Sequence, residues 1–256
     1  MKNTVKFLSL AAILAVAASP AAYADTVAAF NSPLANPGVY YGNTTYNANW
    51  TIITTTGTGN DKSTLQLGLE AITRNVAPIV PSANDYTYQP GTGTSPGLAT
   101  WDFAFSVNTG TDPLNFFNYT INITDDTTGQ QATFNPTLLP DNGQANSSGV
   151  VCHGTPSSPC PYNGANDGMQ NAENLGFSFL SSQFVGGFNP NAYDRYTISL
   201  TATPINSLTD FADPSVSIDV VPPVITPPAV PEPSSLALLG TGLMTVIGAA
   251  RRRFKA

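Results

Sequence analysis

Strict alternation of apolar and polar side chains distinguishes five segments of the chain. They span residues 65–71, 101–107, 117–123, 196–202 and 216–220. A period of two predicts β-strands with one face in a core and the other in water. Weaker patterns predict further strands over residues 39–41, 50–54 and 177–180.

Turn-forming residues separate these segments. Clusters of Gly, Pro, Asn and Asp occupy residues 108–113 and 186–191. Outside the two ends of the chain, no segment predicts a long helix. About eight short strands joined by turn-rich links predict an all-β protein, namely a single antiparallel β-sandwich. A β-barrel or jelly roll is the alternative.

Residues 1–24 have the three parts of a secretory signal peptide. Lys2 and Lys6 give a positive start, residues 7–18 form an apolar run, and Ala22 and Ala24 are the small side chains that signal peptidase accepts. The apolar run is shorter than the ~20 residues that a spanning helix needs. We therefore expect a signal helix that is exported by the Sec machinery and cleaved after Ala24.

Three further segments follow the predicted body domain, residues 25–221. Residues 222–233 form a linker in which six of twelve residues are proline, and proline is excluded from sheet interiors. Residues 234–250 carry no charge and predict a single short transmembrane helix, followed by a basic tail over residues 251–256. The positive-inside rule places the tail in the cytoplasm, so we expect the body on the opposite side of the inner membrane.

The order of features at the C-terminus resembles a known sorting signal. Pro231, Glu232 and Pro233 precede a short apolar helix, and an Arg cluster closes the chain. This arrangement is similar to the PEP-CTERM signal of Gram-negative bacteria. The resemblance implies that a membrane-embedded cysteine protease, an exosortase, reads these three residues and removes the tail. It also implies a host that makes extracellular polysaccharide.

Within the body, the segments GVYYGN, NWTI, LQLGLEA and ATWDFAFSV resemble segments of other PEP-CTERM proteins of unassigned function. This resemblance implies one domain and no particular activity. The expected route is a transient stay in the inner membrane, with the body in the periplasm, and then the cell surface or the extracellular space.

Charge narrows the range of partners. Residues 25–230 hold Lys62, Arg74 and Arg195 against fifteen acidic side chains, a net charge of −12. So acidic a surface repels phosphate backbones and makes nucleic acid an unsuitable partner. Neutral polar residues supply the solubility of the body, as suits an exported β protein.

Cys152 and Cys160 are the two cysteines of the chain. An even count in an exported protein predicts a disulfide between them. Two free thiols are one alternative. The other is a zinc site with His153, which would need reduced thiols and a fourth ligand.

Candidate catalytic residues are few. His153 is the one histidine, so any Ser-His-Asp machinery would have to use it, yet it lies in a predicted surface loop. A glycosidase needs two carboxylates, and the candidates are Asp125, Asp126, Asp102, Glu70 and Glu173. Residues 125–129 are more typical of a turn after a strand. We therefore expect no enzymatic activity and no catalytic residue.

Calcium is the one ion that the loops suggest. Asn and Asp oxygens are its usual ligands, and they cluster over residues 141–146, 163–167 and 189–194. None of these loops has the spacing of an EF-hand, and Asn and Asp also dominate turns for local reasons. The expectation is no cofactor, with structural calcium as the alternative.

The leading interpretation is a noncatalytic cell-surface or extracellular-matrix protein with a structural or adhesive role. The first alternative is a glycan-binding module, in which exposed aromatic rings would stack on sugars. Its candidate residues are Tyr40, Tyr41, Trp50, Tyr86 and Tyr88. The second alternative is a hydrolase that acts on polysaccharide.

Overall fold

The computed structural model describes residues 25–32, 49–57, 64–93, 95–155, 157–205 and 214–224. The chain divides into two compact units, Met1–Val221 and Pro222–Ala256, and the described strands belong to the first. The predicted signal peptide, the predicted strand over residues 39–41, Tyr40, Tyr41, the sorting motif and the predicted transmembrane helix lie outside the described residues. Among the residues described, no helix has the length and hydropathy to cross a membrane.

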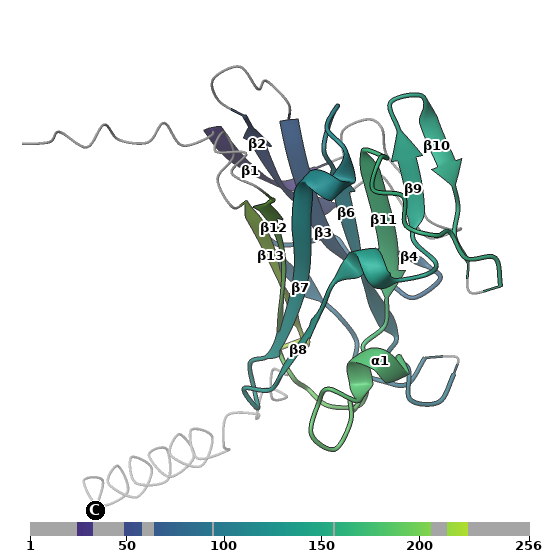
Figure 1. The fold of residues 1–256 in the computed structure, drawn as a ribbon. Helices are drawn as coiled ribbons and strands as arrows, with labels where there is room; N and C mark the ends of the chain where they lie inside the picture. Colours follow the sequence, from purple (N-terminus) through teal and green to yellow (C-terminus); the bar gives the residue numbers. More distant parts are fainter. Residues whose placement is uncertain are drawn as a thin grey trace, which may run out of the picture. The chain divides into compact units, whose positions relative to one another are not determined.

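Two β-sheets face each other across one core (Figure 1). The larger sheet, sheet A, has the order β1 (Asp25–Ser32), β2 (Trp50–Thr56), β3 (Thr64–Thr73), β6 (Trp101–Asn108), β11 (Gly168–Glu173), β9 (Gly143–Asn146) and β10 (Gly149–Cys152), and β4 (Ala77–Pro78) pairs with β3. Sheet B has the order β5 (Asp85–Thr87), β13 (Ser215–Val221), β12 (Tyr196–Pro204), β7 (Phe117–Asp125) and β8 (Gln131–Phe134). The pairing of β5 with β13 is parallel, and the other pairings are antiparallel. The fold is therefore the predicted all-β sandwich and not a closed barrel.

Sheet B follows the predicted alternation. Along β7, β12 and β13, buried residues alternate with exposed or partly exposed ones. The register places Ile121 opposite Leu200, and Leu200 opposite Val216, so that the apolar side chains form rows on one face. This face packs against the inner side chains of β3 and β6, among them Leu69 and Phe105, which are fully buried.

Sheet A departs from the prediction, because β3 and β6 are buried on both faces. The polar side chains expected in water are enclosed instead, with exposed fractions of 7% for Gln66, 0% for Glu70 and 7% for Asp102. A second apolar cluster, formed by Trp50, Ile52 and Ala104, lies on this outer face. The expectation of one wet face is wrong for the two central strands of sheet A.

The five strands predicted from strict alternation are confirmed, and so is the strand over residues 50–54. The strand predicted over residues 177–180 is wrong, because α1 (Ser178–Ser181) forms there. The Phe177 carbonyl accepts hydrogen bonds from the Leu180 and Ser181 amides, and the turn buries Leu180 in the core. The described residues also form two 3₁₀ turns, Leu114–Phe116 and Pro136–Leu138.

Candidate functional site

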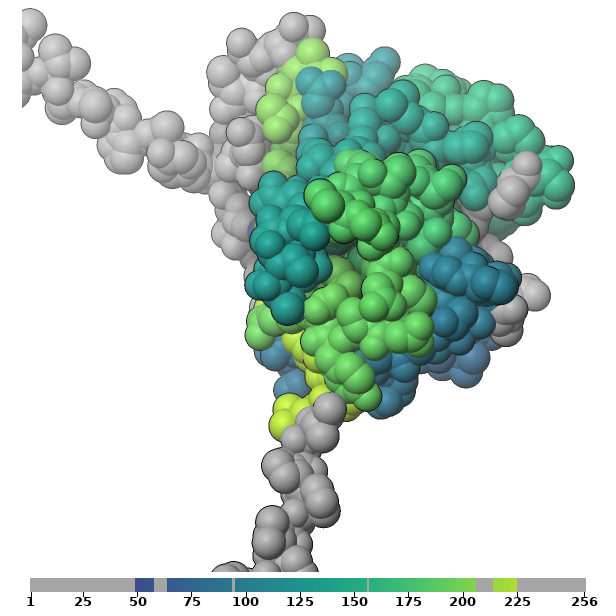
Figure 2. Space-filling view, turned by 90° about the horizontal axis from the view of Figure 1, so that it is seen from below, coloured from purple at the N-terminus to yellow at the C-terminus, as the bar shows by residue number. Residues whose placement is uncertain are grey.

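A cavity of about 160 Å³ lies at the end of the sandwich where β7 turns into β8. Its second wall is the loop that runs from α1 to β12, and Figure 2 looks at this end, with the loop in green beside the turn in teal. The lining residues are Asp125, Thr128, Gln130, Phe184, Val185, Gly187, Phe188, Asn189, Ala192, Asp194 and Tyr196. The cavity therefore combines carboxylates, amides and aromatic rings.

Strand pairing and a tight turn place Asp125 in the cavity wall. Asp125 ends β7 and lies opposite Tyr196, the first residue of β12. Its Oδ1 accepts hydrogen bonds from the amides of Thr127 (2.9 Å) and Thr128 (3.1 Å), and its Oδ2 accepts one from the Thr128 hydroxyl (2.7 Å). Gly129 closes the turn with a φ of 75°, which glycine adopts without strain. The turn predicted over residues 125–129 is confirmed.

Asp194 approaches from the other wall of the cavity. The hydroxyl of Tyr88 lies 3.1 Å from the carbonyl oxygen of Ala192 and 2.9 Å from that of Asp194, and so ties this loop to the core. Burial raises the pKa of the Asp194 carboxyl, and the negative charge of Asp125 raises it further, against hydrogen bonds from Thr127 and Tyr196. The two carboxylates therefore share one region of negative potential.

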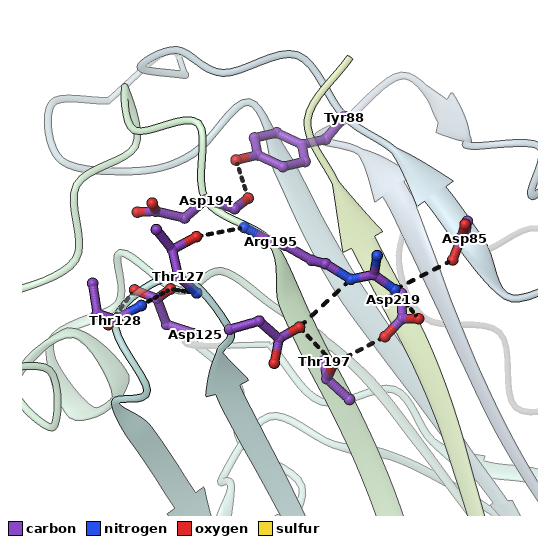
Figure 3. A network of polar contacts seen from close by, with 10 residues as sticks. Asp85, Tyr88, Asp125, Thr127, Thr128, Asp194, Arg195, Thr197 and Asp219 are labelled. Carbon is purple, nitrogen blue, oxygen red and sulfur yellow. Dashed lines mark hydrogen bonds and ion pairs between the residues drawn. The ribbon is translucent and has the colours of Figure 1, made fainter. Parts of the chain in front are cut away.

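Arg195, a basic residue next to Asp194 in the sequence, points away from this cavity. The guanidinium of Arg195 lies 2.6 Å from Asp219, 3.6 Å from Asp126 and 3.9 Å from Asp85. Figure 3 shows it turned toward Asp219 and Asp85, on the far side from Asp125 and Asp194. The positive charge of Arg195 thus serves a separate surface network.

Aromatic rings form the apolar part of the cavity. Phe184 and Tyr196 are buried and Phe188 is half-buried, and the ring centroids of Phe188 and Tyr196 lie 6.1 Å apart. Two exposed side chains flank the cavity: Val185 lines it with 85% of its surface exposed, and Tyr193 precedes Asp194 with 56% exposed. The loop thus presents apolar groups both inside the cavity and beside it.

A larger cavity, about 410 Å³, lies beside Arg74. The contacts of the Arg74 side chain indicate that this residue has a structural role. Arg74 forms an ion pair of 2.8 Å with Asp102 and lies 5.5 Å from the ring centroid of Phe177. The Asn174 side-chain nitrogen lies 2.6 Å from the same Asp102 oxygen. The ion pair therefore joins the end of β3 to β6 and β11.

The remaining candidate catalytic carboxylates are enclosed in sheet A. Glu70, Asp102 and Glu173 have exposed fractions of 0%, 7% and 3%. Burial raises the pKa of all three, to about 9 for Glu70, whose carboxylate oxygens have no hydrogen-bond partner among the described residues. Of the proposed carboxylates, Asp125 lines the 160 Å³ cavity, whereas Asp126 belongs to the Arg195 network.

Cys152 and Cys160 are joined by a disulfide, with their Cα atoms 6.1 Å apart. His153 lies between them and is exposed, as predicted for a surface loop. Oxidised cysteines cannot supply the thiolates that zinc requires. The bridged pair is thus incompatible with the alternative zinc site.

The three loops considered for calcium differ in what their polar groups contact. Those at 141–146 and 163–167 bond to each other: the Gln144 Oε1 accepts from the Asn163 amide at 2.9 Å and from the Asn166 side chain at 3.1 Å. The loop at 189–194 contributes to the 160 Å³ cavity. Within the described ranges, no group of three or more His, Cys, Asp or Glu side chains could hold a metal ion.

Three of the five aromatic residues considered for sugar stacking are described by the structure, and all three are interior residues. Trp50, Tyr86 and Tyr88 are 0%, 0% and 3% exposed. The Tyr86 hydroxyl lies 3.1 Å from Thr51 and 2.5 Å from the Asn49 carbonyl. The hypothesis that Trp50, Tyr86 and Tyr88 form a surface for sugar stacking is therefore wrong.

The C-terminal segment gives the decisive comparison with known proteins. Residues 229–253 match the family model of the PEP-CTERM protein-sorting motif. The chain carries a PEP-CTERM sorting signal. It is accordingly an exported protein that passes through the membrane and is sorted by exosortase, and Pro231, Glu232 and Pro233 lie within the matched range. No curated protein matches the chain, so the comparison identifies the signal and not the activity of the body.

Proposed function

We propose that this chain is a noncatalytic cell-surface or matrix protein, whose β-sandwich is presented outside the cell after exosortase has cut the PEP-CTERM signal. The match over residues 229–253 carries the proposal. The role is structural or adhesive, and extracellular polysaccharide is the partner.

The placement of acidic groups supports a noncatalytic role. A general acid or base must come within hydrogen-bond reach of the substrate. Glu70, Asp102 and Glu173 are enclosed in sheet A, where a polymer substrate does not reach them. Asp125 accepts three hydrogen bonds from its own turn, so its carboxylate is already held by the backbone and side chain of that turn.

The surface of sheet B supports contact with a hydrated polymer. Its outward side chains include Thr120, Ser199, Thr201, Ser215 and Ser217. The hydroxyl oxygens of Thr201 and Ser215 lie 3.0 Å apart. Such neutral hydroxyl groups can exchange hydrogen bonds with sugar hydroxyls without a charge to desolvate.

The substitution Glu232→Ala tests the sorting step. It changes the recognised motif and leaves the apolar segment 234–250 unaltered, so insertion into the membrane should continue while cleavage stops. An epitope placed after Ala256 reports the tail in a host with exosortase and in one without it. Ser235→Ala, two residues beyond the motif, is the matched control and should lose its tail normally. Equal tail retention in Glu232→Ala and the unaltered chain, with exosortase present, would contradict sorting.

The absence of catalysis is tested separately. Purified chain is incubated with the extracellular polysaccharide of its host, and reducing ends are counted. We expect no release above the buffer control, together with retention of the chain on the polymer during sedimentation. Release of reducing ends that Asp125→Asn abolishes would show a hydrolase instead.

A further inference from the structure

The described lining of the 160 Å³ cavity is acidic. Two of the described lining residues, Asp125 and Asp194, carry carboxylates, and none of them is basic. Arg195, although next to Asp194 in sequence, is paired with Asp219, Asp126 and Asp85. The cavity is thus a site of negative potential inside a low-dielectric wall, which attracts cations.

The walls favour an organic cation over a metal ion. Calcium takes six to eight oxygen ligands, whereas three of the lining residues present aromatic rings: Phe184, Phe188 and Tyr196. A cation within about 6 Å of an aromatic face is attracted by the ring quadrupole, and desolvation strengthens the attraction. Two carboxylates beside aromatic rings suit an ammonium group.

The hydrogen-bond acceptors of the cavity also suit an ammonium group. The oxygens of Asp125 accept three hydrogen bonds from Thr127 and Thr128, so their directions are fixed before a ligand arrives. A carboxylate offers about four acceptor positions, which leaves acceptor capacity on Asp125. A primary ammonium has three donors and no acceptor, and therefore complements such a site.

We propose that this cavity binds a primary ammonium group, with Asp125 and Asp194 as hydrogen-bond acceptors and Phe184, Phe188 and Tyr196 as the aromatic wall. The group could come from an amino sugar of a polysaccharide or from a free polyamine. The proposal concerns the cavity alone and does not rest on the noncatalytic role or on exosortase sorting.

Calorimetric titration of the full-length chain in detergent tests the proposal. Glucosamine carries the ammonium, whereas N-acetylglucosamine and glucose have the same ring without the charge. We expect glucosamine to bind at least about tenfold more tightly than either, which corresponds to ~1.4 kcal/mol. 1,4-Diaminobutane is the second arm: a lower Kd than that of glucosamine assigns the site to polyamines, and a higher Kd assigns it to amino sugars.

Two variants connect the binding to the cavity. Asp194→Asn should weaken glucosamine about tenfold, and Phe188→Leu should weaken it severalfold, because each removes one type of attraction. Asp85→Asn removes the same charge from an exposed carboxylate outside the cavity and should leave the Kd unchanged. Circular dichroism checks that the variants fold. If Asp194→Asn does not, the comparison of charged with neutral sugars on the unaltered chain still decides.

Three results would overturn the proposal. The first is binding of glucose or N-acetylglucosamine as tight as that of glucosamine. The second is unchanged affinity in a folded Asp194→Asn variant. The third is calcium binding that depends on Asp194 without measurable amine binding, which would make the cavity a metal site.

Discussion

Replacing Glu70 by Gln should stabilise the protein by an amount that grows with pH. Glu70 lies in the middle of β3 on the outer face of sheet A and is fully buried. In the part of the chain that the structure describes, neither of its carboxylate oxygens has a hydrogen-bond partner. Burial raises its pKa from the ordinary 4.5 to about 9. The folded state therefore holds a proton on Glu70 at neutral pH that the unfolded chain has released.

The sign and the size of the stabilisation by Glu70→Gln follow from the linkage between proton binding and folding. A carboxyl whose pKa is raised by folding favours the folded state fully below pH 4.5, and this advantage is lost as the pH rises toward about 9. Across that window each pH unit costs the folded state ~1.4 kcal/mol. At pH 7 the accumulated cost is roughly 3 kcal/mol. Gln has nearly the same shape and does not titrate, so Glu70→Gln removes this cost.

Urea unfolding at pH 5, 6, 7 and 8, followed by tryptophan fluorescence, measures the effect, since Trp50 and Trp101 are both buried. The difference in unfolding free energy between Glu70→Gln and the unaltered chain should rise by ~1.4 kcal/mol per pH unit. Asp85→Asn removes an exposed carboxylate, 46% accessible, and should change stability by less than ~1 kcal/mol. A difference for Glu70→Gln that stays constant from pH 5 to 8 would refute the reasoning.

Three other predictions concern processing, redox state and packing. N-terminal sequencing of the exported chain should begin at Asp25, and recovery of the uncleaved leader would contradict the signal-peptide assignment. Unfolded, unreduced protein should show no reaction with a thiol reagent, because Cys152 and Cys160 are bridged, whereas two equivalents of reacting thiol would exclude the bridge. Asn174→Ala should lower the unfolding free energy by ~2–3 kcal/mol in urea titration, since the buried Asn174 amide contacts β6 and its flanking loop. Arg195→Met should change it by less than ~1 kcal/mol, because that side chain is 50% exposed.

Sheet B could be read from the sequence because each of its long strands meets one core and one solvent face. Apolar residues at every second position, such as Ile121, Leu200 and Val216, then report the core directly. The same rule also found β3 and β6, whose inner side chains alternate in the same way.

The outer face of sheet A could not be read in this way. Gln66, Glu70 and Asp102 are polar, and local sequence gives no sign that they are enclosed. Their burial depends on their position in the middle of the larger sheet, beside the cluster of Trp50, Ile52 and Ala104. The short strands β9 and β11, with sequences GQAN and GMQNAE, lack an apolar alternation. Long-range pairing defines them instead, because β11 pairs with β6 and β9 pairs with β11.

Part of the 160 Å³ cavity could be predicted from local sequence, and part of it depends on long-range strand pairing. Asp125 and Thr128 form a turn that the sequence predicts from its own residues. The proximity of Asp194 to Asp125 follows from the pairing of β12 with β7, which places Asp125 opposite Tyr196. No spacing in the sequence gives that register, so the two carboxylates could be named as candidates but not brought together.

Three sets of acidic side chains in the sandwich differ in their surroundings, and the contrast indicates where a cationic ligand can act. Those enclosed in sheet A, such as Glu70, are kept from solvent by packing. Asp219, in the surface network, has its charge offset by Arg195 at 2.6 Å. Asp125 and Asp194 border a cavity whose described lining residues include no basic group. Of the three sets, this pair is the one that shares a cavity with aromatic side chains and has no described cation beside it, so it is the set that we expect a cationic ligand to contact.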